Sequence, residues 1–145
     1  MTEAPAGELH VLAQVVGMDG SQPRASIVRG LVGPPSDMRR LPAPDGAELT
    51  FIVFGPGGVE LVMKHDVVSA VVVHLAPGAD HSAYPRIERL LPGGGATLTR
   101  SDLSERLGEP ADLDGQDLFA VGESAALVDY ADGVATRLTL VADES

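Results

Sequence analysis

Residues 99–110, TRSDLSERLGEP, have a counterpart 75 positions earlier, where residues 26–35 read SIVRGLVGPP. At this offset a serine, a glycine and a proline coincide, and apolar positions coincide both within the stretch and upstream of it. The coinciding pairs are Ser26 and Ser101, Val28 and Leu103, Val32 and Leu107, Gly33 and Gly108, Pro35 and Pro110, and upstream Leu12 and Ile87, Val15 and Leu90, and Val16 and Leu91. A single offset shared over such a span predicts a tandem duplication within one compact domain, residues 1–145, with residues 8–76 as the first unit and residues 82–142 as the second.

Each unit is expected to begin with two helices joined by a loop. Residues 8–16 carry apolar side chains at helical spacing, and residues 82–91 carry a serine cap followed by apolar positions. The second helix of the second unit begins after Thr99, whose spacing to Asp102 resembles a capping box, and it ends at Gly108. The second helix of the first unit is expected within residues 26–35.

Strands are expected to follow the helices in both units. Apolar runs between turn residues predict antiparallel meanders, with strands at residues 48–54, 59–64, 67–75, 117–121, 125–130 and 134–141. Residues 67–75 are apolar on both strand faces except for Ser69 and His74, which predicts a central strand. The predicted fold class is therefore α+β, with two helix-loop-helix-meander units forming one curved antiparallel sheet and helices on one face.

The composition excludes cysteine chemistry and indicates a cellular location. The chain has no cysteine, which excludes disulfides, a thiolate zinc site and a cysteine nucleophile. It begins with no basic and apolar leader and has no run long enough to span a membrane. We therefore expect a cytoplasmic location and no membrane partner.

The net charge of −11 is concentrated in the last third of the chain. Residues 1–100 hold 10 acidic and 8 basic side chains, a net charge of −2, whereas residues 101–145 hold 11 acidic and 2 basic side chains, a net charge of −9. Phosphate binding needs a basic surface, so a nucleic-acid partner is not expected. The charge favours a basic protein partner, or else it forms only a solvated acidic surface.

The tandem unit of helix, loop, helix, Gly-x-Pro and meander resembles the β-lactamase inhibitory protein family, whose single-unit relatives include the small lipoprotein of the outer-membrane barrel-assembly machine. The residues that carry this resemblance are Ser101, Leu103, Leu107, Gly108, Glu109 and Pro110, echoed by Ser26, Val28, Val32, Gly33, Pro34 and Pro35. The resemblance implies an eight-stranded curved sheet whose concave face grips a partner protein, without enzymatic activity; small immunity-type proteins look similar. The inhibitors are secreted, disulfide-bonded and rich in aromatic residues at the binding face. This chain has no cysteine and few aromatic residues, so binding of a β-lactamase is not expected.

No group of residues predicts catalysis, a metal or a cofactor. Residues 112–117 carry aspartates at alternate positions, as calcium loops do, but the glycine is at the fourth position instead of the sixth. The four histidines lack the spacing of zinc ligands, and no serine lies in a nucleophile elbow. We expect no enzyme activity, no cofactor and no metal site.

The function favoured by the sequence is a non-enzymatic protein-binding module. Its most concrete form is an immunity or inhibitor-type protein that engages a basic partner, for example a nuclease toxin, through an acidic sheet or loop face. The candidate partner-binding residues are Glu109, Asp112, Asp114, Asp117, Asp129 and Asp132. Two alternatives stay open: a small-ligand or metal-binding protein with its site between the units, and a structural homo-oligomer. The expected quaternary state is a monomer or a homodimer.

Overall fold

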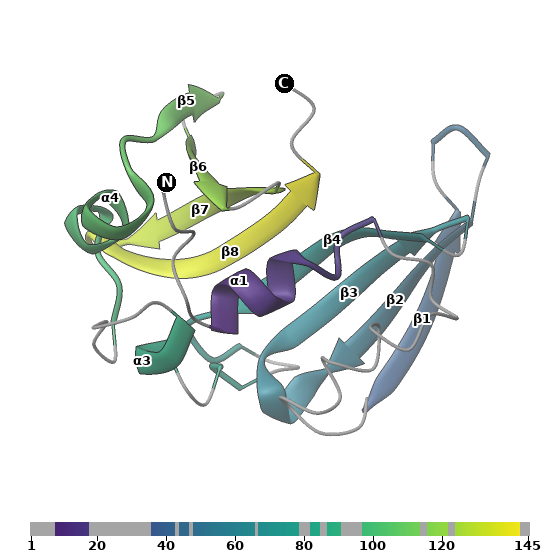
Figure 1. Cartoon of the computed structure of the whole chain (residues 1–145). Coiled ribbons are helices and arrows are strands. Elements are labelled where there is room, and N and C mark those ends of the chain that lie inside the picture. The colour runs from purple at the N-terminus through teal and green to yellow at the C-terminus, as the bar shows by residue number, and fades with distance from the viewer. Residues whose placement is uncertain are drawn as a thin grey trace.

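The fold is mostly β and rests on one eight-stranded antiparallel sheet with the strand order β1-β2-β3-β4-β8-β7-β6-β5 (Figure 1). The structure is a computed structural model. It describes residues 8–17, 36–42, 44–46, 48–65, 67–78, 82–84, 87–90, 97–113, 116–121 and 124–142. The strands are β1 (Asp37–Pro42), β2 (Glu48–Phe54), β3 (Val59–Lys64), β4 (Val67–His74), β5 (Ala111–Leu113), β6 (Gln116–Val121), β7 (Ser124–Ala131) and β8 (Val134–Ala142).

The two halves of the sheet join where β4 pairs with β8. Val71 lies opposite Leu140 and Val73 opposite Leu138, and all four side chains are buried. β4 has strands on both sides, so its prediction as a central strand is confirmed. Because successive side chains of a strand point to opposite faces, this register places the two buried pairs on one face, which we call the inner face.

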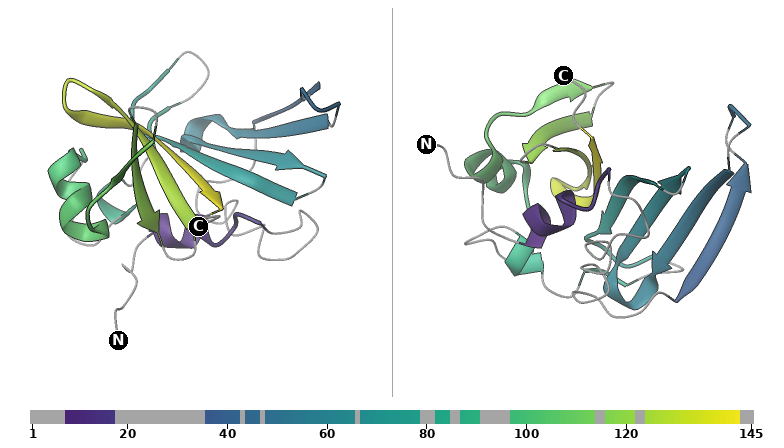
Figure 2. Two further views of the ribbon diagram at one scale, coloured as in Figure 1. Left: turned by 90° about the horizontal axis from the view of Figure 1, so that it is seen from above. Right: turned by 45° about the vertical axis from the view of Figure 1, so that its right-hand side comes forward.

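The helices of the described residues are short. They are α1 (Glu8–Ala13), α3 (Ile87–Leu90) and α4 (Arg100–Leu107), together with the 3-10 turn η2 (Gly55–Gly57). α1 packs against α3, β6 and β8 beside the junction of the two sheet halves (Figures 1 and 2). Leu12 of α1 and Leu103 of α4 belong to one buried cluster with Val71 and Leu140, so both helices cover the inner face.

The start of α4 has the local structure that its sequence predicts. The Thr99 hydroxyl accepts a hydrogen bond from the Asp102 backbone N–H at 3.2 Å, and the Asp102 carboxylate accepts one from the Thr99 backbone N–H at 3.0 Å. This capping box is confirmed, and the hydrogen bond from the Thr99 backbone N–H is the largest of the causes that lower the pKa of Asp102. Gly108 follows the helix with a φ of 93°, a conformation that favours glycine.

The predicted helix at residues 82–91 is wrong in its first turn. Ser82 donates its backbone N–H to the Gly55 carbonyl and Tyr84 donates its own to the His74 carbonyl, both at 2.8 Å. Residues 82–84 are therefore bound to the end of β4 and to η2, and Ser82 does not cap a helix. Only α3 in this region is helical among the described residues.

Two edge strands were not predicted. The strands expected from the sequence begin at residue 48 in the first unit and at residue 117 in the second, whereas β1 and β5 precede them and form the two edges of the sheet. The predicted helix within residues 26–35 lies outside the described residues. None of the described helices is long and apolar enough to cross a membrane.

Candidate binding surface

The face of the sheet opposite the core, which we call the outer face, carries apolar side chains from both halves. The strand registers place them in rows that run across the sheet and cross the junction of β4 with β8. The apolar members of this face are Leu49, Phe51, Val53, Val62, Ala70, Val72, Val141, Ala125, Leu127, Leu118 and Ala120.

Several of these side chains are only half-buried. Phe51 and Val62 of the first half are in this state, and so are Leu127 and Val141 of the second half. Val71 and Leu140, their neighbours on the inner face, are completely buried. A protein that leaves adjoining apolar side chains accessible over a continuous sheet commonly uses that surface for binding.

Polar side chains form one margin of the outer face. Asp129 accepts hydrogen bonds from the Gln116 amide at 2.6 Å and from Arg137 at 2.7 Å. In the adjoining half, His74 Nε2 lies 3.9 Å from the Glu60 carboxylate. The outer face therefore has an apolar centre and a margin of polar side chains that bind one another, as protein interfaces often have.

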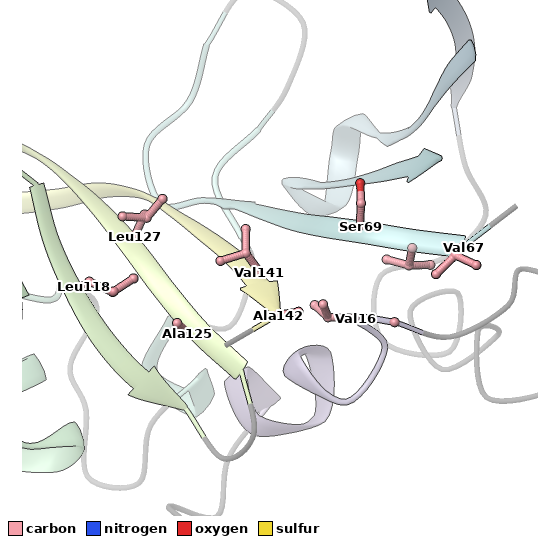
Figure 3. Close-up of a pocket in the computed structure, with 10 residues that line it drawn as sticks. Val16, Val67, Ser69, Leu118, Ala125, Leu127, Val141 and Ala142 are labelled. Atoms are coloured by element: carbon pink, nitrogen blue, oxygen red, sulfur yellow. The ribbon is translucent and has the colours of Figure 1, made fainter. Parts of the chain in front are cut away.

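The outer face also contains a pocket. It has a volume of about 520 Å³ and lies between the starts of β4 and β7 and the end of β8. Leu127, Val141 and Ser69 project from their strands to the side away from α1 (Figure 3). The lining is almost entirely aliphatic, so the pocket suits an apolar group.

The predicted acidic residues do not form one surface. Asp112 and Asp117 lie directly opposite each other across β5 and β6, on the inner-face side of the sheet. Asp129 lies on the outer face. The residue before it, Val128, pairs with Asp117, and successive side chains of a strand point to opposite faces. Asp132 lies in the turn between β7 and β8, and Asp114 is outside the described residues.

The carboxylate of Asp117 is bound by two side chains of the fold itself. Its carboxylate accepts hydrogen bonds from Arg100 at 2.8 Å and from the Tyr130 hydroxyl at 2.9 Å. Burial of the Tyr130 phenol, and then the hydrogen bond to Asp117, raise the pKa of Tyr130. Glu109 and Asp112, by contrast, are exposed, and Asp132 is exposed at its turn.

Among the described residues, no group of three or more His, Asp or Glu side chains is arranged to hold a metal ion. Sequence reasoning missed the apolar outer face, although Leu49, Phe51 and Val53 alternate along one strand and give a signal for it. That alternation becomes a surface only when the pairing of the strands is known.

Comparison with solved structures shows a similar fold at low sequence identity. A cysteine-rich secretory protein from Staphylococcus aureus superposes with a TM-score of 0.56 and 12% identity, over 98% of this chain and 49% of that protein. A DUF4309 family protein from Bacillus subtilis gives a TM-score of 0.46 and 13% identity, over 93% of each chain. This chain thus spans about half the length of the staphylococcal protein, and the likeness concerns the fold alone.

No protein-family model matches the sequence, and no curated protein is significantly similar to it.

Proposed function

We propose that this chain is a non-enzymatic protein-binding module that engages a basic protein through the outer face of its sheet. The observation that carries the proposal is the continuous, half-exposed apolar surface that crosses the β4–β8 junction. Apolar side chains at the centre of an interface supply most of its affinity when they enter pockets on the partner. Phe51 in one half and Leu127 in the other are large, half-buried apolar side chains of this face, and we take them as its anchors.

The charge of the second half supports the choice of a basic partner. Residues 101–145 carry a net charge of −9, and Glu109, Asp112 and Asp132 are exposed there. Such carboxylates around an interface accelerate the encounter with a basic protein more than they tighten the final complex. We assign Glu109, Asp112 and Asp132 to this steering role, and we assign Asp117 and Asp129 to hydrogen bonds within the fold.

We also propose that the sheet is built from two tandem units, as in inhibitor and immunity-type proteins. Two features recur 67 positions apart and support it. His65 and Asp132 have φ angles of 54° and 53° at the ends of β3 and β7, a left-handed conformation that is uncommon outside glycine. The β3–β4 and β7–β8 pairs each contain one register shift, and both shifts lie close to the hairpin turn.

The test is capture of a partner, with the product of a neighbouring reading frame as the first candidate ligand. A variant that carries Phe51→Glu and Leu127→Glu should bind at least about 100-fold more weakly, because two charges would be buried against the partner. The matched control carries Ser101→Glu and Gln14→Glu, which add the same charge at exposed positions of α4 and of the turn after α1. Equal binding by the two variants would remove the outer face from the proposal.

A further inference from the structure

We propose that the pocket of the outer face binds an unbranched alkyl carboxylate, that is, a free fatty acid. The alkyl chain lies along the aliphatic lining, and the carboxylate lies beside Lys64. The pocket shares Leu127 and Val141 with the protein-binding surface proposed above, but the inference rests on separate observations, namely the lining of the pocket and one nearby cation.

The pocket exists because β4 and β8 pair over only part of their lengths. Their pairing runs from Ala70 opposite Val141 to His74 opposite Arg137, so the first three residues of β4 extend past it. There the Val68 carbonyl accepts a hydrogen bond from the Gly17 N–H at 2.7 Å. The turn after α1 therefore closes the space that the two diverging strands leave, and Val16 and Gly17 become part of its wall.

The lining selects the class of ligand. Among the ten lining residues there is no ionisable and no aromatic side chain, and Ser69 carries the one polar side chain. The Ser69 hydroxyl already donates to the Val62 carbonyl at 3.1 Å. Sugars, nucleotides and cations would lose hydrogen bonds to water here without replacement. An alkyl chain loses none, and the volume of about 520 Å³ is within the usual range of ligand pockets.

Lys64 supplies the complement to a carboxylate at the end of the pocket. Val67, a lining residue, lies directly opposite Lys64 in the β3–β4 pairing, so the two side chains share the outer face with Cβ atoms about 4.5–5.5 Å apart. Lys64 forms an ion pair with Asp45, and the two side chains are 36% and 54% exposed. An exposed pair of this kind contributes little free energy, so a second carboxylate can share Lys64 or replace Asp45 at low cost.

Isothermal titration calorimetry of the whole chain with octanoate, decanoate, dodecanoate and tetradecanoate, each below its micelle concentration, tests the proposal. The affinity should rise with chain length by up to about fourfold per methylene group until the pocket is filled. Leu127→Gln and Ala125→Leu should each weaken dodecanoate binding at least about tenfold, since one makes the lining polar and the other fills the space. Ala131→Leu, at an exposed site away from the pocket, is the control for adsorption to the surface.

Two further experiments test the position of the carboxylate and the choice of a free acid separately. Lys64→Gln should weaken dodecanoate several-fold and leave dodecanol unchanged; equal loss or no loss for the two ligands would contradict the placement of the carboxylate. Vesicles of phosphatidylcholine should not bind, and vesicle binding in place of fatty-acid binding would overturn the choice of a free acid. Circular dichroism confirms that each variant is folded. If no chain length gives saturable binding, or if Leu127→Gln and Ala125→Leu bind dodecanoate as the unmodified chain does, the site itself is refuted.

Discussion

Ser69 and Thr136, which are 67 positions apart, make the same hydrogen bond in two different hairpins. Each hydroxyl donates to the carbonyl of the residue seven positions earlier, Ser69 to Val62 at 3.1 Å and Thr136 to Asp129 at 3.2 Å. Each also lies where its strand pair gains one extra residue and the register shifts. A hydroxyl side chain thus binds a carbonyl of the opposite strand at the bulge in both halves of the sheet.

This equivalence predicts similar costs for removing either hydroxyl. Ser69→Ala and Thr136→Ala should each lower the free energy of unfolding by about 0.5–1.5 kcal/mol, and the costs should add in the double variant. Denaturant unfolding measures all three values. A cost at one bulge and none at the other would argue against two equivalent hairpins.

Gly58 is predicted to be the least replaceable glycine of the described residues. Its φ is 66°, and a Cβ atom there would lie 2.6 Å from the Tyr84 backbone nitrogen. Gly58→Ala should therefore cost about 2–4 kcal/mol of unfolding free energy, from overpacking against backbone and from left-handed strain. Gly133→Ala is the matched control, because its φ is 80° but no atom lies within 4 Å of the added Cβ. Its cost should be clearly smaller in the same thermal and denaturant experiments.

The stability of the protein should fall at alkaline pH through Tyr130. Burial and the hydrogen bond to Asp117 raise the pKa of Tyr130 above its ordinary value near 10, so the unfolded chain loses this proton first. The contribution is complete below about pH 10 and is lost as the pH rises beyond it. Tyr130→Phe should weaken this alkaline loss, which pH-dependent denaturation measures, with Tyr84→Phe as a comparison. An unchanged pH profile in Tyr130→Phe would contradict the assignment.

Removal of a carboxylate should lower the free energy of unfolding at Asp129 and change it little at Asp112. Asp129→Ala removes the acceptor of Gln116 and Arg137 and should cost about 1 kcal/mol of unfolding free energy. Asp112→Ala, on an exposed edge strand, should change it by less than about 0.5 kcal/mol. Chemical denaturation of both variants checks the difference, and equal costs would remove the distinction on which the steering role of Asp112 rests.

The sequence predicted the strands that bury one face but not the strands at the edges. Residues 48–54 and 59–64 were placed correctly because each is a largely apolar run bounded by turn residues. β1 is exposed along its whole length and contains Arg39, Arg40 and Pro42, which is typical of edge strands and resembles a loop in sequence. Ser82 shows the opposite error, because its backbone is bound to η2 by a tertiary contact that no local pattern reveals.

The candidate site was less predictable than the fold for a related reason. Asp112, Asp117 and Asp129 are close in sequence, which suggested one acidic surface. A shift of one residue in strand register moves a side chain to the other face, so only the pairing of β6 with β7 shows that Asp117 and Asp129 point apart. The apolar outer face, formed by strands from both halves, likewise depends on the pairing of β4 with β8.

Methyl NMR of the chain in complex with its captured protein partner tests the central claim most directly. The account predicts that the methyl signals of Leu127, Val141, Val72 and Val62, which lie on the outer face in both halves, shift most on binding. Leu103 and Leu107 of α4 should shift little. Shifts confined to α4 and the neighbouring acidic edge, with the outer-face methyl groups unchanged, would contradict it.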